Sequence, residues 1–169
     1  NHDFRLLYIA HNHPGKNLEV INKVCELLKD KNITFVVTID NKSYKDIFSG
    51  NSNVVNLGPV PHESCPSIYS QCDFLFAPTL LETFSASYPE AMKMNIPILT
   101  SKYSFAKSVC QNAAIYFDPY DVGDMAAVIG EVVDTKIDIS VLQKKAADVI
   151  SGIDSWEVYT KKIVNFSSK

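Results

Sequence analysis

Arginine is almost absent from this chain of 169 residues: Arg5 is the only one, against fifteen lysines. A guanidinium group can hold a phosphate or a carboxylate through two parallel hydrogen bonds, which a lysine ammonium cannot do. Any anion bound here would therefore depend on lysine charges and backbone N–H groups. The formal net charge of −3 disfavours a general nucleic-acid-binding protein, so we expect no nucleic acid as a partner.

Long apolar runs are lacking as well. No stretch approaches the roughly 18 residues needed to cross a bilayer, and no signal peptide opens the chain. We therefore expect no transmembrane segment and a cytoplasmic location, with any membrane contact being peripheral and made by another part of the protein. The chain starts at Asn1 rather than at Met, which suggests a piece of a longer protein.

Patterns typical of metal sites are not found either. The four cysteines, at positions 25, 65, 72 and 110, form no C-x-x-C pair, and we interpret them as buried free thiols. His11 and His13 have the spacing of two ligands, but no third ligand lies nearby in the sequence. A D-x-D motif, which could hold a metal against a diphosphate, is absent too. We expect no bound metal and no cofactor.

What the chain does have is a regular alternation of strand and helix patterns. Leu18, Ile21, Val24, Cys25 and Leu28 have the spacing of one buried helix face. Six apolar runs rich in β-formers lie at 4–10, 33–39, 53–57, 73–77, 96–100 and 113–117. Runs that are apolar throughout are typical of a parallel sheet covered on both faces. The pattern predicts one α/β domain over residues 1–169, a Rossmann-like, doubly wound parallel sheet of about six strands.

The end of the chain carries further helical patterns. Asp121 can cap a helix that reaches Val133, with Asp124 in its first turn. Two more helices are expected near 140–151 and 155–166, with Trp156 as a packing anchor between them. No internal repeat or linker interrupts the pattern, which is why a single domain is predicted.

In such a sheet, ligands bind outside the carboxyl ends of the strands. The segments that follow the predicted strands read HNHPGK, GPVPHES, PTLLETFS, SKYS and DPYD, and they hold most of the prolines. Stiff, proline-rich loops suit a site that is held in place before the ligand arrives. Proline and glycine are equally common as simple punctuation between strands and helices, so this pattern leaves both interpretations open.

One loop of this edge holds two glutamates eight positions apart, Glu82 and Glu90. On one continuous helix they would lie roughly 80° apart, a poor spacing for a shared face. Glu82 instead falls in the loop after the strand at 73–77, and Glu90 in the first turns of a helix that starts around 85–87. Two carboxylates beside a helix end that attracts anions would suit a ligand with both hydroxyls and phosphates, such as a nucleotide sugar. Alternatively, Ser87 and Glu90 read as a capping box, S-x-x-E, which would explain Glu90 without any ligand.

The wider context of this loop resembles a known family. The stretches LLYIAHNHPGKNLEVI, NVVNLGPVPHESCPSIYSQCDFLFAPTLLETFSASYPEAMKMNIPILTS, SVCQNAAIYFDPYDVGDMAAVI and SWEVYTKKI follow, in order, the pattern of the group 1 (family 4-like) glycosyltransferases with the E-x7-E signature. The resemblance covers nearly the whole chain. It implies the carboxy-terminal, donor-binding domain of a retaining enzyme with two Rossmann-like domains, the GT-B fold. It also implies that the amino-terminal, acceptor-binding domain is missing from this chain.

The resemblance also implies roles for particular residues. Glu90 matches the glutamate that accepts hydrogen bonds from the ribose hydroxyls of the donor nucleotide, and Glu82 matches the one beside the transferred sugar. The turn Thr83, Phe84 and Ser85 matches the segment whose N–H groups meet sugar and diphosphate. Lys16 matches the lysine that neutralises the departing diphosphate, so Glu82 and Lys16 are the expected catalytic residues. A solvated lysine on a mobile loop is the alternative for Lys16.

The chain departs from the family pattern at several positions. His11 stands where the family often has an arginine, and Ser85 and Gln111 stand where it has glycines. The diphosphate is therefore expected to be bound more weakly, or to be bound in part by residues of the missing half. We expect His13 and His62 to be loop or capping residues. Two aromatic residues of the loop, Phe84 and Tyr88, could line the sugar pocket or pack in the core, and Lys102 is expected to be solvated.

The expected function is thus transfer of a sugar from a UDP-, GDP- or ADP-linked donor to a saccharide or lipid-linked acceptor, as in polysaccharide assembly. The isolated domain would bind the donor without turnover. Alternatives are a non-catalytic nucleotide-binding or interaction module of the same fold, and half of a nucleotide-sugar epimerase or phosphorylase. The base, the sugar and the acceptor leave no readable trace in the sequence.

Overall fold

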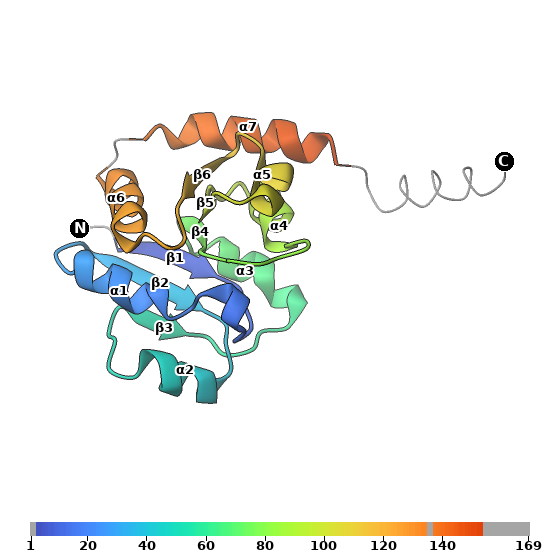
Figure 1. The fold of residues 1–169 in the computed structure, drawn as a ribbon. Helices are drawn as coiled ribbons and strands as arrows, with labels where there is room; N and C mark the ends of the chain where they lie inside the picture. The colour runs from blue at the N-terminus through green and yellow to red at the C-terminus, as the bar shows by residue number, and fades with distance from the viewer. Residues whose placement is uncertain (1–2, 135–136, 154–169) are drawn as a thin grey trace.

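The computed structural model describes residues 3–134 and 137–153, and these form one parallel sheet wrapped by helices (Figure 1). The six strands are β1 (Phe4–Tyr8), β2 (Ile33–Val37), β3 (Val54–Asn56), β4 (Phe74–Ala77), β5 (Ile98–Ser101) and β6 (Ala114–Phe117). Their order across the sheet is β3-β2-β1-β4-β5-β6, and every neighbouring pair is parallel. Each run predicted as a strand overlaps one of them, and only β5 extends beyond its run, by one residue, so the predicted α/β class and the number of strands are confirmed.

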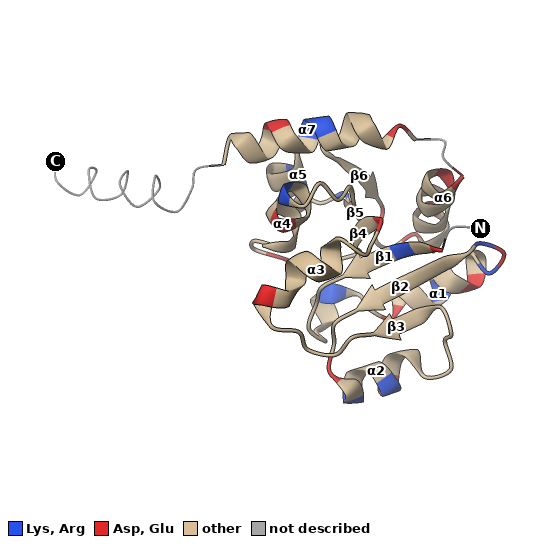
Figure 2. Ribbon diagram, turned by 180° about the vertical axis from the view of Figure 1, so that it is seen from behind, with Lys and Arg blue, Asp and Glu red and all other residues tan. Residues whose placement is uncertain are grey.

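Seven α-helices and two short 3₁₀ helices accompany the strands of the described part, and the last two α-helices follow the final strand. The α-helices are α1 (Val20–Leu27), α2 (Asn41–Phe48), α3 (Cys65–Tyr69), α4 (Ser87–Lys93), α5 (Ser104–Cys110), α6 (Val122–Val133) and α7 (Ile139–Ser151). The 3₁₀ helices are η1 (Pro14–Lys16) and η2 (His62–Ser64). Helix α1 packs with α6, while α4 packs with α5 and α7. Views from opposite sides show α1 in front of the sheet in Figure 1 and α3 in front of it in Figure 2, so helices cover both faces.

The sheet forms the core because its strands are buried on both faces. Phe76 of β4 lies between Phe35 of β2 and Phe117 of β6, with ring centroids 5.3 and 5.4 Å away. The five residues of the predicted helix face from Leu18 to Leu28 are all buried. All four cysteines are buried and free, as predicted.

The helices predicted from the sequence near the end of the described part are confirmed for α6 and α7. Asp121 caps α6, because its side chain accepts a hydrogen bond from the Asp124 N–H, and the helix ends at Val133 as predicted. Helix α7 corresponds to the helix predicted near 140–151. The helix predicted at 155–166 and its Trp156 lie outside the described residues. Lys102 is exposed, as predicted, and its Nζ also pairs with Asp118 at 2.9 Å.

The order of the strands determines where a crevice can open. The chain leaves β1 in one direction to build β2 and β3, then returns beyond β1 to build β4, β5 and β6. The loops after β1 and β4 therefore diverge at the point where the order reverses, which is where open α/β sheets bind their ligands.

Candidate functional site

A cavity of about 590 Å³ lies at this reversal, at the carboxyl ends of the central strands. It is lined from the loop after β1, the segment between β3 and η2, and the loop between β4 and α4. The sequence-predicted site residues that line it are His11, Lys16, Glu82, Phe84, Ser85 and Glu90. Thr83 is the one predicted site residue that does not line it. The fold therefore brings together residues that lie almost 80 positions apart in the sequence.

Lys16 is held by a compact turn after β1. The side chain of His13 caps η1 by accepting a hydrogen bond from the Gly15 N–H at 3.1 Å, as predicted for a capping residue. Asn17 ends the turn in the left-handed conformation, at a φ of 55°. The buried hydroxyl of Tyr8 donates a hydrogen bond to the Lys16 carbonyl at 2.8 Å and also contacts the hydroxyl of Thr79 at 2.9 Å. Lys16 thus sits on an anchored turn rather than on a free loop.

Gly15 joins this turn to the loop after β4. Its carbonyl accepts hydrogen bonds from the N–H groups of Leu80 at 2.7 Å and Leu81 at 3.3 Å. A Cβ atom at position 15 would lie 3.2 Å from Nδ1 of His13, closer than most side chains approach, and 3.4 Å from the Leu81 carbonyl, which is an ordinary contact. The Gly15 carbonyl therefore joins the two loops, while the absence of a side chain mainly leaves room for the His13 ring within the turn.

Glu82 and Lys16 form an ion pair across the junction of these loops. The Glu82 Oε2 accepts a hydrogen bond from the lysine Nζ, and its Oε1 accepts one from the Thr83 N–H at 3.1 Å. Partial burial acts to raise the pKa of Glu82, but Lys16 and the N–H groups of Thr83 and Phe84 outweigh it and lower the pKa below its ordinary value. The Glu82 carboxylate is therefore ionised near neutral pH. It binds the Lys16 ammonium and the Thr83 N–H, two groups that the family resemblance assigns to the ligand.

Glu90 lies in the first turn of α4, and its carboxylate is held by two side chains. One oxygen, Oε2, accepts a hydrogen bond from the Tyr69 hydroxyl at 3.1 Å; the other, Oε1, lies 3.2 Å from Nε2 of His62. The capping box is not formed: the residue before α4 is Ala86, and the Ser87 hydroxyl contacts that of Ser85 at 2.7 Å. The alternative that explained Glu90 by helix capping is therefore wrong.

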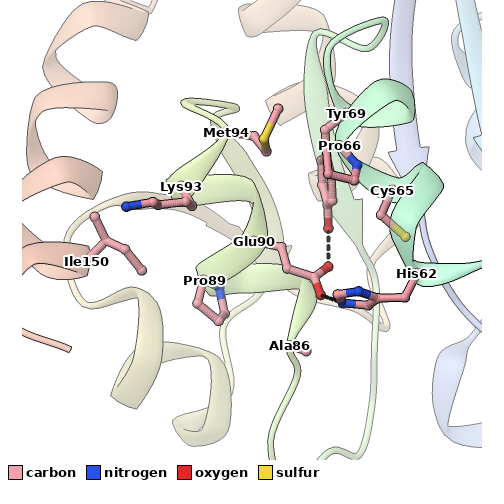
Figure 3. Close-up of a pocket in the computed structure, with 10 residues that line it drawn as sticks. All are labelled: His62, Cys65, Pro66, Tyr69, Ala86, Pro89, Glu90, Lys93, Met94 and Ile150. Atoms are coloured by element: carbon pink, nitrogen blue, oxygen red, sulfur yellow. Dashed lines mark hydrogen bonds and ion pairs between the residues drawn. The ribbon is translucent and has the colours of Figure 1, made fainter. Parts of the chain in front are cut away.

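A second cavity, of about 390 Å³, lies on the other side of Glu90 between α3, α4 and α7 (Figure 3). Glu90, His62, Cys65 and Ala86 line both cavities. The remaining walls of the second cavity are mostly apolar, formed by Pro66, Tyr69, Pro89, Lys93, Met94 and Ile150. The Glu90 carboxylate thus lies at the boundary between the two spaces.

The other candidates divide between the site and the core. His11 is exposed on the rim, and Phe84 is 63% exposed while lining the larger cavity. Tyr88 belongs to the core, where its hydroxyl contacts that of Thr100 at 2.8 Å. His62 lies in the connection between β3 and α3, where its side chain caps no helix and contacts Glu90.

Three residues that support the site were not found from the sequence: Tyr8, Tyr69 and Thr79. Tyr8 ends a buried strand and Tyr69 ends a short helix, so both read as ordinary core residues. For the two tyrosines the sequence offers one indication: a buried phenol oxygen needs a hydrogen-bond partner. Which partner it finds depends on elements distant in the sequence, and no local pattern reveals it.

Comparison with known proteins identifies the family. The family described as "Glycosyl transferases group 1" matches residues 3–135. The GPI3 subunit of phosphatidylinositol N-acetylglucosaminyltransferase from Saccharomyces cerevisiae is 28% identical over 143 residues, covering 80% of this chain and 30% of that subunit. The chain therefore spans less than a third of that relative's length.

Solved structures share the fold at low sequence identity. A glycosyltransferase from Rickettsia africae has a TM-score of 0.84 at 13% identity, covering 98% of this chain and 47% of that one. TarM of S. aureus, in a complex that contains UDP, has a TM-score of 0.82 at 17% identity, covering 96% of this chain and 35% of that one. This chain thus has the Rossmann-like fold of one domain of GT-B glycosyltransferases.

Neither a metal-binding cluster nor a membrane-spanning helix is present among the described residues. Within 3–134 and 137–153, no three side chains of His, Cys, Asp or Glu converge on a point where they could hold a metal ion. No helix of that same part has the length and apolar character needed to cross a bilayer.

Proposed function

The chain belongs to the glycosyl transferases group 1 family, and we propose that it is the donor-binding half of a retaining glycosyltransferase. The observation that carries the proposal is that Lys16, Glu82 and Glu90 line one cavity at the reversal of strand order. One cation and two carboxylates, all on anchored segments, suit a ligand that carries a diphosphate and several hydroxyls. A nucleoside diphosphate sugar has both.

Each of the three side chains has a role in this proposal. Glu90 accepts hydrogen bonds from the ribose hydroxyls. Lys16 leaves Glu82 for the diphosphate, and Glu82 then accepts hydrogen bonds from the hydroxyls of the transferred sugar. His11, on the rim, is a further donor for the diphosphate when it is protonated. Thr83, Phe84 and Ser85 offer backbone N–H groups to the same part of the ligand once Glu82 has turned.

The proposed chemistry is transfer of a sugar to a hydroxyl of a saccharide or lipid-linked acceptor. The bond between the anomeric carbon and the diphosphate breaks, and the anomeric carbon bonds to the acceptor oxygen with retained configuration, while the proton of the acceptor hydroxyl passes to the departing diphosphate. Negative charge develops on the diphosphate as the bond breaks, and a cation held beside that charge lowers the barrier. Lys16 supplies this cation without requiring a metal ion.

The acceptor site lies outside this chain in the proposal. The chain spans 30% of the yeast relative and less than half of the solved chains named above, so a second domain that binds the acceptor is expected. The 169-residue chain alone should bind the donor but not turn it over. We place the enzyme in the cytoplasm, where the second domain could meet a membrane-bound acceptor peripherally.

A chemical-shift titration of the chain with UDP, GDP and ADP tests the proposal, and UDP comes first because the TarM structure contains it. We expect one nucleotide to shift the amide signals at 15–17 and 85–91. Glu90→Gln should weaken that response by about 10-fold or more, because a charged acceptor for the ribose hydroxyls is lost. Glu131→Gln, at an exposed position on α6, is the matched control and should bind like the wild type. If no nucleotide binds at millimolar concentration, the alternative of a non-catalytic module is favoured.

A further inference from the structure

The buried phenol of Tyr69 donates a hydrogen bond to the Glu90 carboxylate, and Tyr69 does not line the larger cavity. We propose that Tyr69 is a positioning residue for nucleotide recognition: it fixes the Glu90 carboxylate so that its Oε1 faces the ribose diol. This inference rests on the proposed function, because it assigns Glu90 to the ribose. Tyr69 itself touches no ligand in this arrangement and acts only through Glu90.

The position of the Tyr69 hydroxyl is fixed by its surroundings. The side chain is 1% exposed, and it extends from the last residue of α3 toward α4. Its hydroxyl lies 3.1 Å from Oε2 of Glu90 and 3.3 Å from the carbonyl oxygen of Ser87, in the first turn of the same helix. Burial, together with the charge of Glu90, raises the pKa of Tyr69 well above its ordinary value. The phenol therefore remains protonated, and its single hydrogen is donated toward these two oxygens.

Glu90 needs such a partner because two other environments compete for it. Its side chain has three rotatable bonds, is 27% exposed, and lies between the cavities of 590 and 390 Å³. Lys93, one turn further along α4, lines the smaller cavity, and oppositely charged residues three positions apart on a helix attract each other. Figure 3 shows Lys93 extending toward Ile150, away from Glu90, while the carboxylate points at Tyr69 and His62. Without the phenol, the carboxylate would be free to turn toward Lys93.

His62 contributes less to this positioning than Tyr69. Its side chain is 83% exposed, so water can replace the imidazole at Oε1 with little loss. A ligand hydroxyl can replace it in the same way, which makes Oε1 the oxygen available to the diol. The Tyr69 hydroxyl, by contrast, is buried, and water does not easily replace a buried hydrogen bond to a carboxylate.

The test compares nucleotides with and without ribose hydroxyls. The best-binding diphosphate among UDP, GDP and ADP and its 2′,3′-dideoxy form are titrated into the wild type and into Tyr69→Phe. We expect Tyr69→Phe to raise the Kd of the ribonucleotide by about 5- to 20-fold and that of the dideoxy form by less than about 2-fold. Tyr44→Phe is the matched control, because it also deletes one phenol hydrogen bond, to the Val54 carbonyl, outside the site.

The possible outcomes separate the role of Tyr69 from the role of Glu90 on which it depends. If the wild type prefers the ribonucleotide and Tyr69→Phe retains the full preference, the inference is overturned while the proposed function stands. If the wild type binds but does not discriminate, or binds no nucleotide at all, the proposed role of Glu90 fails and the inference fails with it. Adding Lys93→Met to Tyr69→Phe should restore part of the lost affinity, because it removes the competing cation.

A structure of the wild-type complex provides a test that does not depend on the variant folding. With the nucleotide bound, one carboxylate should contact the Tyr69 hydroxyl through Oε2 and the ribose through Oε1. A Glu90 side chain that leaves Tyr69 when it binds the ribose would overturn the inference.

Discussion

Lys16 and Glu82, 66 positions apart in the sequence, form an ion pair in the wall of the candidate site. They meet because β1 and β4 are neighbours in the sheet, so the loops that follow these strands leave from adjacent positions. The pair means that the lysine assigned to a diphosphate already has an anionic partner. A ligand must therefore displace a carboxylate before it can use that charge.

This competition predicts opposite effects for the two members of the pair. Glu82→Gln should bind a nucleoside diphosphate about 3- to 10-fold more tightly than the wild type, because the competing charge is gone and Lys16 is released. Lys16→Met should bind it about 10-fold more weakly, with a smaller dependence on salt. Calorimetric titrations at two salt concentrations measure both effects. A nucleotide sugar should gain less than the nucleotide from Glu82→Gln, because that variant also changes the proposed sugar contact.

The contrary result is easy to recognise. If Glu82→Gln weakens nucleotide binding as much as Lys16→Met does, then Glu82 supports the lysine rather than competing with the ligand for it.

The lowered pKa of Glu82 predicts an acid-dependent contribution to stability. A carboxyl group whose pKa is lower in the folded than in the unfolded state, where it is about 4.3, stabilises the fold above that value. The contribution is lost as the pH falls through the folded-state pKa. Melting curves between pH 7 and pH 3 should therefore show the difference between wild type and Glu82→Gln shrinking below about pH 4. Parallel curves over the whole range would show that the pair adds nothing to stability.

Tyr8→Phe should loosen the turn that carries Lys16. The variant deletes hydrogen bonds to the Lys16 carbonyl and the Thr79 hydroxyl in a buried place, and we expect the free energy of unfolding to fall by about 1–2 kcal/mol. Amide exchange at Lys16 and Asn17 should become faster. Tyr44→Phe should also lower stability without changing exchange at these two residues. Equal exchange in wild type and Tyr8→Phe would mean that η1 holds its shape without the phenol.

Gly15→Ala should disturb the turn that carries Lys16. The added Cβ would press on the His13 ring, whose Nδ1 caps this turn, so both stability and nucleotide affinity should fall. Gly130→Ala is the matched control, because a Cβ at position 130 of α6 meets nothing within 4 Å. Replacing a glycine within a helix by alanine should raise stability there by up to about 1 kcal/mol. Thermal melts and titrations of both variants measure the contrast, and a Gly15→Ala variant with unchanged affinity would contradict it.

The sequence by itself determined the fold and the edge at which the site lies. Buried parallel strands are apolar on both faces, so the six strands appear as continuous runs that can be read locally. The cap of α6 by Asp121 and the cap of η1 by His13 also involve neighbours within three positions. Given these elements, the carboxyl edge follows from the parallel arrangement alone, and it placed Lys16, Glu82 and Glu90 near one another.

Only the tertiary structure decided what the site residues contact. Glu90 could cap its own helix or turn outward, and the choice depended on Tyr69 and His62, which lie 21 and 28 positions away. Glu82 could face solvent or Lys16, and the choice depended on the packing of two loops through Gly15. These alternatives differ by the energy of one or two hydrogen bonds, which is too little for local sequence to settle. The contacts of Glu90 and Glu82 are instead decided by residues from distant parts of the sequence that the sheet brings together.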